Sequence, residues 1–186
     1  MLNGVLRINA DGHAELLPFV HGAADFAESW IQTLIFEHPR LVPAEALGGA
    51  EQFIPICREL TLSGASGGVF LDVFGVTSTG RPVLIECKLW RNPQARREVV
   101  GQILEYSALL QGLAYEDVVA RCRSRLGDGS SDPVLGAARA AVPDLNESNF
   151  VDRFSTCLDE GDFALVIAGD GIRSEVRRIV DQLARG

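Results

Sequence analysis

Histidine and cysteine are both scarce in this chain, and neither is arranged to hold a metal. The 186 residues include 3 histidines without a metal-binding spacing and 4 cysteines that lie far apart, with no CxxC pair. Zinc sites and disulfide scaffolds are therefore disfavoured. We expect reduced thiols, several of them in the core.

Long apolar runs and a surplus of basic residues are missing as well. No run approaches the roughly 20 residues of a membrane-spanning helix, so no membrane partner is expected. Residues 1–13 lack the basic region and apolar core of a secretory signal, so we expect a cytoplasmic protein. The net charge of −8 at pH 7 argues against a general nucleic-acid binder, although local charge decides what one site binds.

The chain has the size of a single domain with a core of its own, and 47% of its residues are hydrophobic. We divide it into a hairpin over 1–22, one half of the core over 23–113, and a region over 114–186 with helices and the last core strand. Periodicity and turn residues predict hairpin strands Val5–Ile8 and Glu15–Phe19, strands Phe53–Leu62, Val69–Val76, Pro82–Leu89 and Phe163–Ala168, and helices Phe26–Leu41, Pro93–Leu113, Tyr115–Leu126, Pro133–Ala141, Asn146–Glu160 and 172–183.

Three charged residues interrupt the most apolar part of the sequence. Asp72 lies inside the run Val69–Val76, and Glu86 and Lys88 lie inside Pro82–Leu89. Apolar strands of this kind are covered on both faces, where an unpaired charge costs several kcal/mol. These charges must therefore be paired or hold a metal.

Strand alternation predicts that Glu86 and Lys88 share one face, with Ile85 and Cys87 on the other. Folding of the hairpin brings Asp72 opposite the charged pair. Two carboxylates with waters suit Mg²⁺, and a lysine in a partly dry site can have a lowered pKa and accept a proton from water. Metal and base together hydrolyse phosphodiesters. The alternative is a buried ion pair that only fixes the strand register.

The order Asp72, then Glu86-Cys87-Lys88 across a hairpin, resembles the D…ExK signature of the PD-(D/E)XK nuclease superfamily. The next helix carries Gln102 and Tyr106, one turn apart on one face, which resembles the QxxxY motif of the RecB-type branch. The D…ExK pattern alone is loose, but this order of hairpin, motif and helix is much more specific. The resemblance covers residues 26–106.

This resemblance implies an α/β fold with a restriction-endonuclease-like core. In such a core a mixed central β-sheet is flanked by helices, and the N-terminal β-hairpin is an elaboration outside it. The implied activity is hydrolysis of DNA phosphodiester bonds by an Mg²⁺- or Mn²⁺-dependent nuclease, either endonuclease or exonuclease. DNA is the implied partner, a homodimer is possible, and the implied roles are DNA repair, defence or mobile-element processing.

The same resemblance assigns metal ligands. Asp72 and Glu86 would bind the metal together with the backbone carbonyl of Cys87. Glu28 matches the acidic residue that the superfamily often carries on its first core helix, and Glu37 is its rival.

Glu28 is preferred because it precedes an apolar helix face, formed by Trp30, Ile31 and Leu34, that must pack on the sheet. The competing explanation for Glu28 is a solvated residue that favours the helix dipole.

The remaining site residues would act on water and substrate. Lys88 would orient or deprotonate the attacking water, while Gln102, Tyr106 and Arg91 would position the substrate. Arg96 would contact a phosphate, or else belong to a solvated helix face. For Tyr106 the alternative is a half-buried aromatic residue that closes the core.

Two other functions fit the sequence. One is a catalytically silent module that keeps the nuclease fold and binds nucleic acid or protein. The other is a metal-free acidic interaction domain, which a Lys88–Glu86 salt bridge without a surrounding cavity would support.

Overall fold

The computed structural model describes residues 4–8, 14–18, 27–49, 51–64, 67–89, 95–127 and 129–169. The elements are β1 (Gly4–Ile8), β2 (Ala14–Pro18), α1 (Glu28–Glu37), the 3₁₀ helices η1 (Pro39–Leu41) and η2 (Ala44–Leu47), β3 (Phe53–Gly64), β4 (Gly67–Thr77), β5 (Pro82–Lys88), α2 (Ala95–Leu110), α3 (Tyr115–Leu126), α4 (Pro133–Ala141), α5 (Glu147–Glu160) and β6 (Ala164–Gly169). No helix among these residues is long and apolar enough to cross a bilayer.

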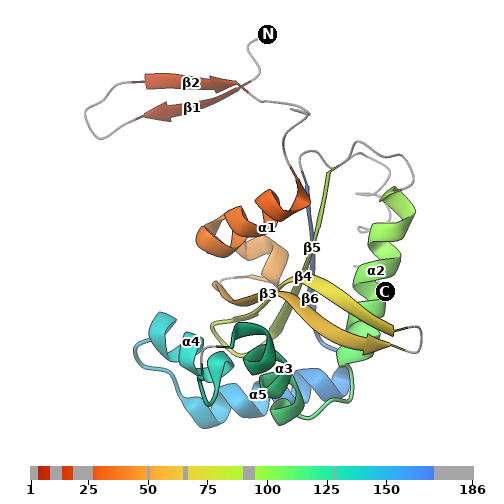
Figure 1. Cartoon of the computed structure of the whole chain (residues 1–186). Coiled ribbons are helices and arrows are strands. Elements are labelled where there is room, and N and C mark those ends of the chain that lie inside the picture. The colour runs from red at the N-terminus through yellow and green to blue at the C-terminus, as the bar shows by residue number, and fades with distance from the viewer. Residues whose placement is uncertain are drawn as a thin grey trace.

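A four-stranded mixed sheet forms the centre of the molecule, with strand order β3-β4-β5-β6. The first three strands are antiparallel, and β6 joins β5 in parallel. Strands β1 and β2 pair antiparallel in a separate sheet, drawn apart from the main body in Figure 1. The predicted α/β class, mixed sheet and N-terminal hairpin are confirmed.

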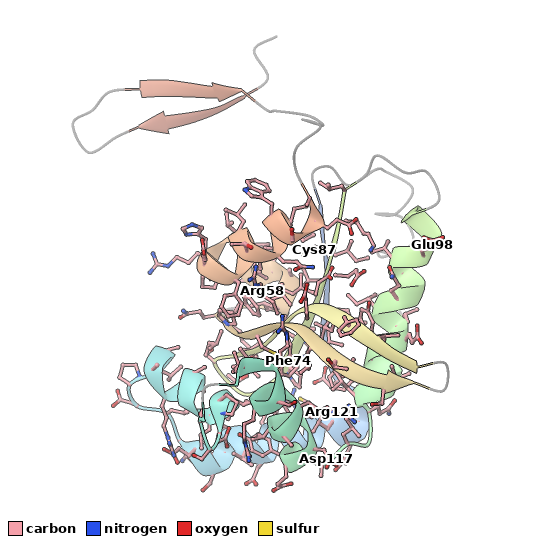
Figure 2. All side chains as sticks on the ribbon, viewed as in Figure 1. Arg58, Phe74, Cys87, Glu98, Asp117 and Arg121 are labelled. Carbon is pink, nitrogen blue, oxygen red and sulfur yellow. The ribbon has the colours of Figure 1, made fainter. Side chains whose placement is uncertain are left out.

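Helices cover both faces of this sheet (Figure 1). On one face α1 packs Ile31 and Ile35 against Val73, Ile85 and Cys87. On the other face α2–α5 form the larger core, whose sheet residues include Leu60, Phe74 and Leu84. Figure 2 shows Cys87 on the α1 side and Phe74 on the side of α3.

The predicted helix ends on this larger face are explained by capping. Asp132 accepts a hydrogen bond from the amide of Leu135 at the start of α4, and Asn146 accepts one from Asn149 at the start of α5. Helix α5 ends at Gly161, whose positive φ of 72° suits glycine. The bounds of α3 and α4 match the predicted ones, and those of α5 differ from them by one residue.

Three sequence predictions need correction. Helix α1 ends at Glu37 and not at Leu41, because proline at position 39 cannot continue the helix and begins η1. Trp30 is 48% exposed and does not pack on the sheet, because Ile31, Gln32 and Ile35 form the buried side of α1. Helix α2 ends at Leu110 and not near residue 113, since Gly112 has a φ of 79°. The predicted C-terminal helix over 172–183 lies outside the described residues.

The four cysteines, Cys57, Cys87, Cys122 and Cys157, are free and buried, as expected.

We predict that Gly75→Ala destabilises the protein by about 1–3 kcal/mol or more, the usual cost of overpacking a core. A Cβ at Gly75 in β4 would lie 2.4 Å from the carbonyl oxygen of Ile54 and 2.4 Å from the Phe53 ring. Urea unfolding measures the change. Gly136→Ala in α4 is the control, because a Cβ there meets nothing within 4 Å. Equal stability of the two variants would contradict this packing.

Candidate functional site

The charged residues lie where β4 and β5 separate. These strands pair from Val76 opposite Pro82 to Val73 opposite Ile85, and the recorded pairing ends there. The next position on β4 is Asp72, and the next on β5 is Glu86. From this point β5 continues beside β6, while β4 continues beside β3. The two carboxylates therefore lie at a fork in the sheet.

Strand β3 is also irregular beside this fork. Its pairing with β4 skips the position of Asp72, between Arg58 opposite Val73 and Leu60 opposite Leu71. Glu59, at the skipped position, has a φ of 53°, which is unusual for a residue other than glycine. Irregular strand positions are over-represented next to functional sites. The sheet is thus disturbed on both sides of Asp72.

Asp72 is held by one hydrogen bond at each carboxylate oxygen. Its Oδ2 accepts a hydrogen bond from the Cys87 amide at 2.7 Å, and its Oδ1 accepts one from Gln32 Nε2 at 2.8 Å. Burial raises the pKa of Asp72, although the Cys87 amide and the Lys88 charge oppose this shift. The carboxylate is therefore fixed from both β5 and α1.

Glu86 is the most deeply buried charged group of the site. Its exposed fraction is 1%, and its Oε2 has no hydrogen-bond partner among the residues that the structure describes. Its Oε1 forms a salt bridge of 3.0 Å with Lys88 Nζ, so the two side chains share a face as predicted. Burial and then the charge of Asp72 raise the pKa of Glu86 to about 7.

The predicted lowering of the Lys88 pKa is wrong for this arrangement. Burial lowers this pKa, but Glu86, Glu28 and Asp72 raise it by more, and the net shift is upward. Lys88 is therefore a firmly protonated cation among carboxylates. The Lys88–Glu86 salt bridge, one of the two features that would support the metal-free interpretation, is also present.

Glu28, and not Glu37, lies at the site. Its Oε1 accepts a hydrogen bond of 3.2 Å from the Leu89 amide, and its Oε2 is 3.6 Å from Lys88 Nζ. Glu37 is exposed at the far end of α1. The first turn of α1 therefore contacts the end of β5.

Helix α2 brings Tyr106 to the other side of the charged group. Tyr106 is 4% exposed and belongs to the larger core. Burial, followed by the charges of Glu86 and Asp72, raises the pKa of its phenol, so the ring both closes the core and faces the carboxylates. Gln102, one turn earlier, has a buried Oε1 that finds no hydrogen-bond partner in the described part of the chain. An unsatisfied buried amide of this kind calls for a ligand or a water.

Three other predicted roles keep their status as predictions. Arg91 lies outside the described residues, and Arg96 lies on α2 but its side chain is not described. Cys87 joins the site through its amide, which donates to Asp72, while its thiol packs on the α1 side. The role of its carbonyl as a metal ligand is untested.

The fork offers a divalent cation two carboxylates, so an ion bound there would keep most of its own waters. No group of three or more His, Cys, Asp and Glu side chains in the described part of the chain is arranged to enclose a metal. Asp72 and Glu86 still offer two carboxylates, and Glu86 Oε2 is buried without a partner. Mg²⁺ is commonly bound through one or two carboxylates. A cation would also offset the negative charge that Lys88 alone does not balance at this site.

The sequence did not predict the involvement of Gln32. Its side chain is buried and donates to Asp72. The available signal was its position four residues after Glu28, which places both on one face of α1.

Comparisons with protein-family models, with curated proteins and with solved structures gave no match. The resemblance to PD-(D/E)XK nucleases therefore rests on the sequence motifs alone.

We predict that Glu86→Gln stabilises the metal-free protein above pH 7. The pKa of Glu86 is about 7 when folded and near 4.5 when unfolded, so the folded state binds more protons between these values. The free energy of unfolding of the wild type should then fall as the pH rises through this window, by about 1–3 kcal/mol. Glutamine removes this loss, so the variant should gain stability at pH 8 and little near pH 4.5.

Urea unfolding in EDTA at pH 4.5, 6 and 8 measures this effect. Glu147→Gln is the control, because its exposed carboxylate pairs with Arg139 and its pKa is lowered. Parallel pH profiles for the wild type and Glu86→Gln would contradict the prediction.

Proposed function

We propose that this protein is a divalent-metal-dependent nuclease that hydrolyses DNA phosphodiester bonds. The observation that carries the proposal is the meeting of Asp72, Glu86 and Lys88 at the fork between β4 and β5, with Glu86 Oε2 left without a partner. A cost in stability at a buried charge cluster is typical of functional sites. The D…ExK and QxxxY order along the chain supports the same assignment.

In this proposal Asp72 and Glu86 would hold Mg²⁺ or Mn²⁺, the Cys87 carbonyl would be a further ligand, and Glu28 would belong to the surrounding shell. Such an ion supplies Lewis acidity and offsets the negative charge that develops at the phosphoryl group. The hydrogen bonds of Asp72 keep its carboxylate in one orientation before the ion arrives. This preorganisation reduces the reorganisation that binding requires.

Lys88 acts on the nucleophile and on the phosphoryl oxygens. Its raised pKa makes it a donor and not a base in the metal-free site, so we assign it to orienting water and stabilising developing charge. Water attacks phosphorus, the P–O bond to the leaving group breaks, one proton of the water is lost to solvent, and the leaving oxygen takes a proton.

In this proposal, residues around the fork contact the DNA. Gln102 presents a buried amide without a partner for its oxygen, and Tyr106 lies beside it on the same helix. Because Tyr106 is buried, we assign it to orienting Gln102, and we assign Gln102 to hydrogen-bonding a water or a DNA phosphate. Arg91 and Arg96 would position the substrate strand. Because the whole chain carries a charge of −8, such contacts must be concentrated at this site.

A second candidate is a catalytically silent binding module. The observation that favours it is the direct Lys88–Glu86 salt bridge, which neutralises one of the proposed metal ligands. In such a module the ion pair would fix the sheet register, and no metal would bind.

We predict that Asp72→Asn and Lys88→Ala each reduce cleavage of DNA in Mn²⁺ or Mg²⁺ by about 100-fold or more while the protein stays folded. Labelled single-stranded, duplex and flapped DNA are the substrates. Arg139→Ala is the charge-matched control, because this arginine forms an exposed pair with Glu147 on the far helices. Full activity of Lys88→Ala would refute the assignment.

We predict that Mn²⁺ binds the wild type and raises its melting temperature, and that Asp72→Asn abolishes both effects. Glu28→Gln should weaken binding because Glu28 adds negative charge beside Lys88. Glu37→Gln, an exposed residue of the same helix, should leave binding unchanged. Calorimetry measures the affinity, and absence of Mn²⁺ and Mg²⁺ binding in the wild type would favour the silent module.

A further inference from the structure

Helix α1 reaches both strands of the fork from one of its faces. Gln32 donates to Asp72 on β4 at 2.8 Å. Glu28, one helical turn earlier, accepts from the Leu89 amide at 3.2 Å, directly after the end of β5. Residues four apart lie on one face of a helix, so both contacts fix α1 in the same rotation.

We propose that Gln32 is a positioning residue for the metal ligand Asp72, an inference that rests on the proposed nuclease function. The Gln32 side chain is 7% exposed, which is rare for an amide unless the amide is hydrogen-bonded. The side-chain Nε2 of Gln32 donates a hydrogen bond to Asp72 Oδ1. The buried amide of Gln32 is therefore satisfied by the same hydrogen bond that orients the Asp72 carboxylate.

The two hydrogen bonds that Asp72 accepts determine which lone pairs of its carboxylate remain free for a cation. A carboxylate has about four lone-pair positions. Gln32 uses one on Oδ1, and the Cys87 amide uses one on Oδ2. Donors on both oxygens fix the plane of the carboxylate, and one lone pair on each oxygen stays available for a cation. Without Gln32, Asp72 would keep the Cys87 amide as its hydrogen-bond donor among the described residues, which leaves rotation about the side chain.

A purely structural role for Gln32 predicts a different outcome. If Gln32 only filled space under α1, a residue of the same length without a donor would serve as well. Methionine has this length and lacks the donor. Thr33, the next residue of α1, provides a matched control. Its hydroxyl donates a hydrogen bond to the Ser29 carbonyl and accepts one from Arg58. Among the described residues it forms no hydrogen bond with Asp72.

The test is Mn²⁺ calorimetry on the wild type, Gln32→Met, Gln32→Asn and Thr33→Val, each checked by thermal unfolding. Loss of an outer-shell partner weakens metal binding by about 10–100-fold, so we expect this rise in Kd for both Gln32 variants and none for Thr33→Val. Asparagine keeps polarity but is one methylene too short, so it serves if methionine disturbs the fold. In cleavage assays kcat should fall as the Kd for Mn²⁺ rises, while KM for DNA at saturating Mn²⁺ should stay within about twofold.

A second readout needs no metal. The ¹³C chemical shift of the Asp72 carboxyl, assigned with Asp72→Asn and recorded at pH 8 in EDTA, should move in the Gln32 variants and stay in place in Thr33→Val. Unchanged Kd and carboxyl shift in folded Gln32 variants would overturn the positioning role and leave the nuclease proposal standing. A wild type that binds no Mn²⁺ would overturn both.

Discussion

The hydrogen bond from the Cys87 amide to Asp72 is the interaction on which the site depends. It occurs where β4 and β5 stop pairing, so a side-chain oxygen satisfies an amide at the point where the strands separate. A buried amide without an acceptor would cost about 1–3 kcal/mol. The fork is therefore stable because an ionisable residue occupies the position that follows the last strand pair.

This arrangement concentrates negative charge in a place that disfavours it. Glu86 and Asp72 both have raised pKa values because they are buried, and Lys88 is the cation that the described residues bring to them. The core on both faces of the sheet must offset this cost, and its strands are fully buried around Phe74 and Ile85. Natural proteins commonly carry a cost in stability of this kind at functional sites.

Local patterns in the sequence predicted most of the fold. Alternation placed Glu86 and Lys88 together, and caps and prolines gave the ends of α3, α4 and α5 to within one residue. Properties set by tertiary packing were harder to predict. The exposure of Trp30 depends on how α1 is rotated against the sheet, and that rotation is set by Glu28 and Gln32. The Lys88 pKa likewise depends on three carboxylates from separate elements, which no spacing rule combines.

The buried cysteines give this protein internal reporters of local opening. Cys87 lies in the smaller core under α1, directly beside the fork, whereas Cys57 and Cys122 lie in the larger core. Thiol alkylation requires an exposed thiolate, so its rate at each cysteine follows the free energy of exposing that part of the molecule. Faster labelling at Cys87 would mean that α1 lifts from the sheet while the larger core stays closed. The labelling rates of these native cysteines would therefore distinguish local opening at the site from global unfolding, without an introduced probe.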